Sequence, residues 1–416
     1  MHIGMITASH EPVVNGVTQM VTLYEKYLTS SGHRVTIFTL GRPEQGEEPT
    51  TTVRSPGIPL GRTGYHLATG YSRIAQERLR GVDIIHCHHP LMGLEFARRY
   101  GQVPIVFTNH SRYDLYLSSY GRMPEWLAIQ LMGITWRRLA RLADVVIAPS
   151  NSIKELLLAS GVDVPIEVIE NGIELRRFRL NSQEITRSEL KIPDGAIVYV
   201  YVGRMAPEKN VIRLLNEFRQ AASIHRGLHL LGIGSGPLQD TVTRLIAQYG
   251  LGERAHFIGH VEPGKVPAYL ALGDAFVSAS VTEVHPLTAL EAIASRLPVI
   301  AVNSPGFRDI VVDGNSGLLV DGTKGSLAEA MIRLGNDDLL RHRLAAGAEA
   351  HSERYEIEKT VIRTVKLYKR LLSEHHHDPF LDGKSGDRRR DSQRSRKVQQ
   401  HSHDVRQLWT EDGRGV

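Results

Sequence analysis

Short apolar runs alternate with amphipathic helical patterns along most of this 416-residue chain. Strand–helix alternation is typical of parallel sheets whose two faces are covered by helices. The runs form two series, separated by a polar stretch near Leu180–Gly195. The expected strands are His2–Thr7, Arg34–Leu40, Asp83–His86, Ile105–Thr108 and Val145–Ala148, then Ile197–Val202, His229–Ile233, His256–Ile258, Ala275–Ser278 and Pro298–Val302. The sequence therefore predicts an α/β protein with two parallel sheets, closed by a helix at Ile357–Leu372.

The composition is that of a globular protein, with 41% hydrophobic and 23% charged residues. The formal net charge of +5 is too small to predict a nucleic-acid binder. A single cysteine, Cys87, excludes an intrachain disulfide and favours a reducing compartment. The opening MHIGMITASHE is typical of a first strand and not of a signal peptide, and no apolar run reaches the ~18 residues of a spanning helix. We therefore expect a cytoplasmic protein, attached at most to a membrane face.

The last part of the chain, residues 375–416, has a different composition. It is polar and charged, with almost no large apolar side chains, so it is expected to be a disordered basic tail. Its basic run could contact anionic lipid or nucleic acid, but a solvated tail is the favoured interpretation. Its three adjacent histidines do not indicate a built metal site.

The segment VYVYVGRMAPEKNVIRLLNEF, residues 198–218, carries a candidate phosphate site. A strand-like run is followed by a short loop, and Asn210 opens an amphipathic helix. Helix N-termini offer free N–H groups and a positive dipole to anions, and Arg204 and Lys209 add two full charges at the same place. A diphosphate would suit this site. The alternative is a solvated basic loop in which Glu208 pairs with the cations.

The segment TEVHPLTALEAIA carries a second candidate, at the end of another expected strand. Glu283 lies in the loop, and Pro286 fits the first turn of a helix, where its missing N–H costs nothing. The N–H groups of Leu287 and Thr288 remain available to a phosphate, and Glu291 follows inside the helix. The two carboxylates could each accept hydrogen bonds from sugar hydroxyls. Alternatively, Glu291 is an exposed helix residue and Glu283 a capping acid.

Several motifs occur together and in a fixed order. They are PVVNGVTQMV at 12–21, VIENGIELRRF at 168–178, GRMAPEKN, LGIGSGP at 231–237, FIGHV at 257–261 and two glutamates separated by seven residues. This combination resembles the retaining nucleotide-sugar glycosyltransferases of family 4, including diacylglycerol glucosyltransferases and phosphatidylinositol mannosyltransferases. The resemblance extends from about residue 2 to residue 374 and leaves out the tail.

The resemblance implies a GT-B architecture, in which two Rossmann-like domains face each other across a cleft. Residues 1–180 would form the acceptor-side domain and residues 196–355 the nucleotide-sugar-binding domain. Residues 356–374 would form a helix that crosses back to the first domain. No metal or other cofactor is expected, because Arg, Lys and backbone amides would neutralise the diphosphate.

The resemblance also implies a donor site by residue-wise transfer. It comprises Gly16, Arg204, Lys209, Gly259, His260, Val261, Glu283, His285, Leu287, Thr288 and Glu291. Arg204 and Lys209 would clamp the diphosphate and stabilise the leaving group. Glu283 would contact the donor sugar, and Glu291 would contact the ribose.

Two further positions bear on donor recognition. Residues 259–261 would line the base, and Gly16, which lacks a side chain, would let the first helix N-terminus approach the phosphates. The family often has a bulky aromatic residue in place of His285 and a glycine in place of Pro286. His285 could add a hydrogen bond or narrow the sugar pocket, so this departure leaves the donor preference open.

The segment VDIIHCHHPLMG, residues 82–93, contains three histidines. His86, His88 and His89 lie at a strand end, where alternation sends neighbouring side chains to opposite faces, so a metal cluster is not favoured. We expect His88 to line the cleft, and the resembling family commonly has a His-x-His-x-Pro segment here.

His110 follows the strand Ile105–Thr108 and should therefore face the cleft. In the resembling family, a histidine here lies against the transferred sugar, so His110 is assigned to sugar positioning on the acceptor face. It is not assigned as a general base, because these reactions proceed by front-side attack. The alternative is a satisfied histidine at a domain edge. Arg112 and Tyr113 would complete the acceptor side, as in enzymes that glycosylate diacylglycerol.

The segment MPEWLAIQLMGITWRRLARLAD, residues 123–144, is predicted to be a helix. Its clearly polar stripe passes through Gln130, Arg137 and Arg141, and apolar residues occupy most of the rest. Such a helix buries two sides, and Trp with Arg suits an anionic membrane surface. The alternative is a helix packed between the sheet and its neighbours.

The expected activity is retaining transfer of a hexose from a UDP- or GDP-sugar to an acceptor hydroxyl. A membrane lipid such as diacylglycerol is the favoured acceptor, which would place the protein peripherally on the inner face of the plasma membrane. The alternatives are a soluble metabolite or polysaccharide acceptor and a non-catalytic nucleotide-sugar-binding module. The sequence does not define the oligomeric state.

Overall fold

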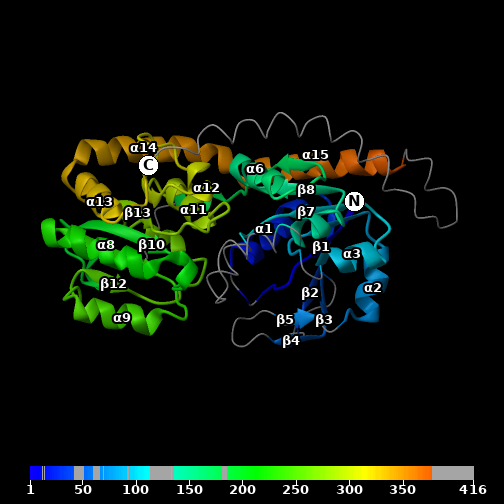
Figure 1. Cartoon of the computed structure of the whole chain (residues 1–416), viewed down its shortest axis with the longest axis horizontal. Helices are drawn as coiled ribbons and strands as arrows, with labels where there is room; N and C mark the ends of the chain where they lie inside the picture. The colour runs from blue at the N-terminus through cyan, green and yellow to red at the C-terminus, as the bar shows by residue number, and fades with distance from the viewer. Residues whose placement is uncertain are drawn as a thin grey trace.

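The computed structural model describes residues 1–11, 13, 15–41, 51–59, 66–68, 70–90, 93–112, 133, 135–179 and 185–376. Two parallel sheets, each flanked by helices, lie at opposite ends of the long axis (Figure 1). The predicted α/β fold class with two sheets is therefore confirmed. The expected tail lies outside the described residues, apart from His375 and His376 at its start.

The first sheet has seven parallel strands in the order β3-β2-β1-β6-β7-β8-β9. Its strands are β1 (His2–Ile6), β2 (Arg34–Leu40), β3 (Thr52–Ser55), β6 (Ile84–Cys87), β7 (Ile105–Thr108), β8 (Val145–Ala148) and β9 (Ile166–Val168). The accompanying helices are α1 (Gly16–Ser30), α2 (Arg73–Arg80), α3 (Gly93–Tyr100) and α6 (Asn151–Ala159). A separate antiparallel pair joins β4 (Gly57–Pro59) to β5 (His66–Ala68). The central strands are buried along their whole length, as expected for a parallel sheet covered on both faces.

The second sheet has six parallel strands in the order β12-β11-β10-β13-β14-β15. Its strands are β10 (Ile197–Val202), β11 (Leu228–Ile233), β12 (Ala255–Phe257), β13 (Ala275–Ser278), β14 (Val299–Val302) and β15 (Gly317–Val320). The accompanying helices are α8 (Val211–Ile224), α9 (Gln239–Gln248), α10 (Val266–Leu270), α11 (Leu287–Ala294), α12 (Pro305–Arg308), α13 (Ser326–Asn336) and α14 (Asp338–Ser352). The order places β10 beside β13, so the loops that follow these two strands emerge next to each other.

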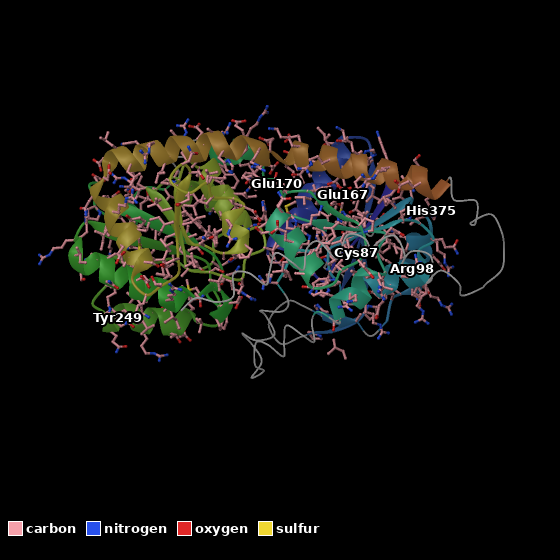
Figure 2. The ribbon with its side chains drawn as sticks, turned by 45° about the horizontal axis from the view of Figure 1, so that its top comes forward. Cys87, Arg98, Glu167, Glu170, Tyr249 and His375 are labelled. Carbon is pink, nitrogen blue, oxygen red and sulfur yellow. The ribbon has the colours of Figure 1, made fainter. Side chains whose placement is uncertain are left out.

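Two chain segments connect the sheets and bind each other where they cross. Ile173 donates its N–H to the carbonyl of Tyr355 at 2.8 Å and accepts from the N–H of Ile357 at 3.0 Å. A Cβ on Gly172 would lie 2.6 Å from the Cα of Ile357, so this approach requires glycine. Glu170, which is labelled in Figure 2, pairs with Arg354 beside this crossing.

After the crossing, α15 (Ile357–His376) continues the line of α14 along one side of the molecule (Figure 1). It packs on α1 of the first sheet, where the hydroxyls of Tyr24 and Thr364 are 3.3 Å apart. A second contact joins the two halves of the molecule. Asp309, beside α12 of the second sheet, accepts hydrogen bonds from the N–H and hydroxyl of Ser152 in α6 of the first sheet, at 3.2 and 3.0 Å. In the part of the chain that the structure describes, no helix is both long and apolar enough to cross a bilayer.

Candidate active site

The structure joins the two candidate motifs through an ion pair between Lys209 and Glu283. Lys209 follows β10 through a short 3-10 turn, Pro207–Lys209, and Glu283 follows β13. The Nζ of Lys209 lies 2.6 Å from Oε1 of Glu283, and their side chains are 21% and 15% exposed. Carboxyl ends of adjacent parallel strands are where α/β proteins place ligands. The structure therefore brings the two candidate motifs together, although they are far apart in the sequence.

Arg204 contacts Glu208, as the alternative interpretation of this loop required. Its guanidinium pairs with the Glu208 carboxylate, which is itself buried, while the Arg204 side chain is 43% exposed. The carbonyl of Glu208 accepts a hydrogen bond from the hydroxyl of Thr282 at 3.1 Å. The loop is therefore not simply solvated: Glu208 fixes Arg204 on one side and the Glu283 loop on the other.

Two glycines that the sequence analysis gave no role hold the next loop against this one. Gly234 has a φ of +126°, and a Cβ there would lie 2.1 Å from the carbonyl oxygen of Gly203. A Cβ on Gly236 would lie 2.5 Å from the carbonyl oxygen of Met205. The Met205 N–H donates to the carbonyl of Ser235 at 3.0 Å. The spacing of LGIGSGP after an expected strand was the available signal for this close approach.

Gly234→Ala is expected to cost roughly 3 kcal/mol of unfolding free energy, because it adds backbone strain and a steric clash. Gly250→Ala is a matched control, because Gly250 also has a positive φ, +64°, but no atom lies within 4 Å of its Cβ position. It should cost only about 1 kcal/mol. Urea unfolding measures both. Equal losses would contradict the steric explanation.

Glu291 lies on α11 and lines a cavity of about 280 Å³ between the two sheets. The cavity is also lined by α1 and by the segment that follows Ile173, including Thr18, Lys26, Glu174, Arg177 and Phe178. Burial raises the pKa of Glu291 to about 7, while the Arg177 guanidinium acts in the opposite direction. The exposed-helix alternative for Glu291 is therefore wrong, because Glu291 is only partly exposed and α1 and the segment after Ile173 shield it.

The N-termini of α1 and α11 face each other beside this cavity. A Cβ on Gly16 would have the Cδ1 of Leu287 as its neighbour, at 3.9 Å. The N–H groups of Val17 and Thr18 already donate to Oδ1 of Asn15, at 2.9 and 3.0 Å. Fewer α1 amides are therefore available to a ligand than the sequence suggested.

Small differences from prediction occur around α11 and β12. Pro286 is the residue before α11 and not part of its first turn, so Leu287 is the first helical residue, followed by Thr288. In the segment after β12, Gly259 accepts from the N–H of Gly234 at 2.7 Å, His260 is exposed and Val261 is partly buried against the core. The predicted base-lining segment thus contacts the glycine loop directly.

The sequence left two roles open for His285, an added hydrogen bond to the donor or a narrower sugar pocket. Its side chain is buried, with its ring 5.6 Å from the ring of Tyr355 in an edge arrangement. Neither ring nitrogen has a hydrogen-bond partner among the described residues, and the Asn171 side chain binds the His285 carbonyl at 3.2 Å. Neither role is seen in the structure, because the turn before α11 directs the ring into the core at the crossing.

His285→Phe is expected to raise the unfolding free energy by about 1 to 2 kcal/mol near neutral pH, because it removes an unpaired buried N–H. Burial lowers the pKa of His285 from 6.5 to about 3. As the pH falls through 6.5, His285 therefore takes up a proton in the unfolded state but not in the folded state, which destabilises the wild type. The difference in unfolding free energy between His285→Phe and the wild type should therefore grow by about 2 kcal/mol as the pH falls from about 8 to about 5. Urea titrations at several pH values measure this difference. His342→Phe, at an exposed position, is the control, and a pH-independent effect of His285→Phe would contradict the assignment.

The histidines of the first sheet form a cluster beneath the cleft. His88 is 1% exposed, so the expectation that it lines the cleft is wrong, because His110 covers it. Its Nδ1 lies 2.9 Å from Nε2 of His110, which is partly exposed. His86 is buried with its two nitrogens 2.6 Å from the hydroxyls of Tyr368 and Thr108. Burial lowers the pKa of His110 to about 4, so its ring is neutral near pH 7. Among the described residues, no group of three or more His, Cys, Asp or Glu is arranged to hold a metal ion.

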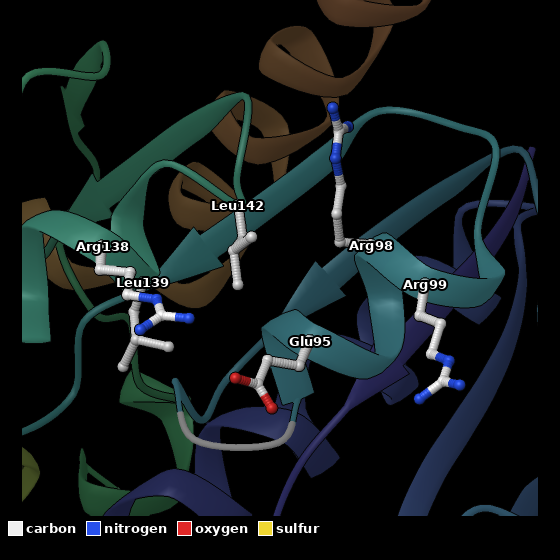
Figure 3. A pocket seen from close by; sticks show the side chains of 6 residues that line it. All are labelled: Glu95, Arg98, Arg99, Arg138, Leu139 and Leu142. Carbon is white, nitrogen blue, oxygen red and sulfur yellow. The ribbon is translucent and has the colours of Figure 1, made fainter. Parts of the chain in front are cut away.

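The remaining acceptor-side predictions are only partly within the described residues. Arg112 is described and partly buried, whereas Tyr113 and residues 123–132 lie outside the description. In the described end of the predicted helix, Trp136 is buried with its ring 5.8 Å from that of Phe107. Arg137 and Arg138 are exposed. A depression of about 250 Å³ lies beside them, lined by Glu95, Arg98, Arg99, Arg138, Leu139 and Leu142 (Figure 3).

Known protein families match both halves of the chain. The model of glycosyltransferase family 4 matches residues 14–177, and that of glycosyl transferases group 1 matches residues 182–351. The chain is 28% identical over 365 residues to the alpha-monoglucosyldiacylglycerol synthase of Streptococcus pneumoniae, covering 83% of this chain and 81% of the relative. It is 30% identical over 313 residues to the D-inositol 3-phosphate glycosyltransferase of Nocardia farcinica, covering 71% and 68%.

A solved structure supports the same conclusion on the fold. Anabaena HepE, crystallised with UDP and glucose, superposes with a TM-score of 0.72 at 20% identity, covering 89% of this chain and all of that one. The predicted GT-B fold and the resemblance on which it rested are therefore confirmed. This chain belongs to the glycosyltransferases of the GT-B fold, with a family 4 domain followed by a group 1 domain.

Proposed function

We propose that this protein is a retaining hexosyltransferase that uses a nucleotide diphosphate sugar and acts on the hydroxyl of a membrane lipid such as diacylglycerol. The observation that carries the proposal is the pairing of Lys209 with Glu283 at the ends of β10 and β13. A cation and a carboxylate at 2.6 Å form a site that can meet a phosphate on one side and a sugar hydroxyl on the other.

In the proposed donor complex, Arg204 and Lys209 neutralise the diphosphate as negative charge develops on the leaving group. The first amides of α11, at Leu287 and Thr288, add donors at a helix N-terminus. Glu283 accepts hydrogen bonds from the transferred sugar. The two side-chain cations make a metal ion unnecessary in this proposal.

The nucleoside lies toward the cavity between the sheets. Glu291 accepts a ribose hydroxyl there, and residues 259–261 contact the base. Nucleotide binding should lower the pKa of Glu291, because two hydroxyl donors favour the ionised carboxylate. Gly16 admits the donor phosphates at the facing end of α1.

A lipid acceptor is supported by two observations. The Streptococcus pneumoniae relative is named for a diacylglycerol glycolipid, and its match covers most of both chains. Arg137 and Arg138 are exposed at the described end of 123–144, and Arg138 lines a depression together with Arg98 and Arg99 of α3. We propose that this basic surface contacts anionic headgroups on the inner face of the plasma membrane, while His110 and Arg112 face the acceptor.

A soluble acceptor is the second candidate. The Nocardia farcinica relative is named for D-inositol 3-phosphate. The buried contact of Trp136 with Phe107 also agrees with ordinary packing of the same segment. A non-catalytic binding module is the least favoured, because Arg204, Lys209 and Glu283 are all present, with Lys209 paired to Glu283, and Glu291 lines the cavity.

A transfer assay with a panel of UDP- and GDP-sugars tests the proposal, run with and without diacylglycerol in anionic liposomes. We expect sugar transfer only when diacylglycerol is present. NMR of the glycolipid product should show the same anomeric configuration as the donor. Transfer to a soluble inositol phosphate without lipid would establish the second candidate. Donor binding without transfer under any of these conditions would contradict the proposal that the protein is an enzyme.

Membrane contact is tested separately by liposome co-sedimentation. The double variant Arg137→Gln/Arg138→Gln should shift from pellet to supernatant with anionic vesicles. Arg244→Gln/Arg343→Gln removes two exposed arginines elsewhere and is the charge-matched control. Equal loss in both variants would show that net charge, and not this surface, drives binding.

A further inference from the structure

We propose that His88 is a positioning residue that holds His110 in the tautomer protonated on Nδ1, so that His110 presents an N–H donor to the sugar or acceptor oxygen. This inference deepens the proposed function and rests on its assignment of His110 to the transfer site. It assigns a direction to a hydrogen bond that the sequence could not define.

The geometry restricts the two rings to one shared hydrogen bond. Nδ1 of His88 and Nε2 of His110 are 2.9 Å apart, and the rings are stacked at 5.2 Å with an interplanar angle of 21°. One nitrogen must donate and the other accept. Since Nε2 of His110 is engaged, only its Nδ1 remains for a ligand.

The burial of His88 decides which nitrogen donates. Its Nε2 is buried and has no hydrogen-bond partner among the described residues. A neutral imidazole carries one N–H, and an unpaired buried N–H is rarer and costlier than an unused acceptor lone pair. The proton of His88 is therefore on Nδ1 and is donated to Nε2 of His110. His110 must then carry its own proton on Nδ1.

The surroundings keep the His88 ring from turning over. The ring of His86 lies 4.1 Å from it, and His86 is held at both nitrogens by Tyr368 and Thr108. The ring of Tyr24, from α1, is 5.8 Å away on another side. Helix α15, which begins at the crossing, thus supports the transfer site through His86 and His88.

The titratable groups that face this pair include no acid that would favour its charged form, and His86 and His89 favour the neutral form. They are Tyr24 from α1, His86 and His89 from the end of β6, and Tyr368 from α15 by way of His86. Burial lowers the pKa of His88 and of His110, and no carboxylate is among the groups that shift them. His110 is therefore available as a neutral donor and not as a base at Nδ1.

Two substitutions of equal size separate the possibilities. His88→Asn keeps an N–H donor close to the position of Nδ1, whereas His88→Asp offers only acceptors there. We expect transfer within about threefold of wild type for His88→Asn. For His88→Asp, His110 should reverse its tautomer and gain a higher pKa, and kcat/KM should fall on the order of 100-fold. The acid limb of the pH profile should move toward neutral pH in His88→Asp alone.

A direct readout does not depend on activity. Long-range nitrogen–proton NMR spectra of ¹⁵N-histidine-labelled protein distinguish the two tautomers, and the His110 signals are those lost in His110→Gln. Protonation on Nδ1 in the wild type is expected, and protonation on Nε2 would overturn the proposal even if the Asp variant failed to fold. His229→Asn is the matched control for His88→Asn. His229 and His256 form a similar pair in the other sheet, in which Nδ1 of His229 lies 3.1 Å from Nε2 of His256.

Two outcomes separate the role of His110 from that of His88. If His110→Ala transferred sugar at the wild-type rate, His110 would not belong to the proposed site, although the NMR result would still hold. An unchanged pH profile in His88→Asp, with His110→Ala inactive, would overturn only the positioning role of His88.

Discussion

Lys209→Ala is expected to lower kcat/KM for sugar transfer by about 10³-fold, with most of the loss in kcat. The reason is that the Lys209 ammonium lies at the ends of β10 and β13, where the proposed leaving group gains charge. An interaction that strengthens as charge develops lowers the barrier more than it tightens the ground state. Steady-state kinetics with saturating donor measure the effect. Lys324→Ala, which removes an exposed cation of the same half of the chain, should leave kcat/KM unchanged.

A double variant separates the catalytic loss from a structural one. Lys209→Ala leaves the Glu283 carboxylate, 15% exposed, without its 2.6 Å partner, which should cost about 1 to 3 kcal/mol of unfolding free energy. Lys209→Ala/Glu283→Ala removes both charges and should recover much of that stability without recovering transfer. Recovery of transfer together with stability would mean that the pair is structural.

The sequence was sufficient to predict features that depend on a local residue pattern or on the order of the strands. Long buried strands such as Ile197–Val202 carry their own apolar pattern, and the ion pair between Lys209 and Glu283 follows once β10 and β13 are neighbours. The short strands β3, β9 and β15 were not predicted. They are three or four residues long and contain polar or glycine residues, so their pairing partners define them more than their own pattern does.

The direction of individual side chains near the cleft could not be predicted. His88 and His285 each sit in an irregular segment, where neither the strand nor the helix period determines which way a ring points. Glu291 was placed correctly on its helix, yet its burial comes from α1 and the segment after Ile173, which the sequence does not bring together. The glycine loop at Gly234 is similar, because its steric partner is the backbone of another strand end.

Arg187 binds the polar stretch before β10 to the second sheet. This role could not be predicted from the sequence. Its Nε and Nη2 donate to the carbonyl of Leu272 at 3.0 and 2.8 Å, and its Nη1 donates to the carbonyl of Ala196 at 2.9 Å. Its Nη2 also lies 3.0 Å from the Asp274 carboxylate, which in turn accepts the N–H of Val198 at 2.7 Å. One guanidinium therefore pairs the groups that position the start of β10.

Arg187→Ala is expected to cost roughly 3 to 5 kcal/mol, a large part of the ~5 to 15 kcal/mol that stabilises a domain. It removes the Arg187 donor from the carbonyls of Leu272, Ala196 and Asp194. It also leaves the Asp274 carboxylate, whose side chain is only 27% exposed, with the Val198 N–H but without its cation. Arg187→Lys should recover little, because a single ammonium cannot reach all the acceptors that the planar guanidinium reaches. Lys191→Ala, an exposed cation four residues along the same stretch, is the control and should change stability by less than about 0.5 kcal/mol. Urea unfolding followed by circular dichroism measures all three variants. A loss in Arg187→Ala no larger than in Lys191→Ala would mean that these bonds are exchanged for water without cost, and that β10 is positioned by its apolar neighbours alone.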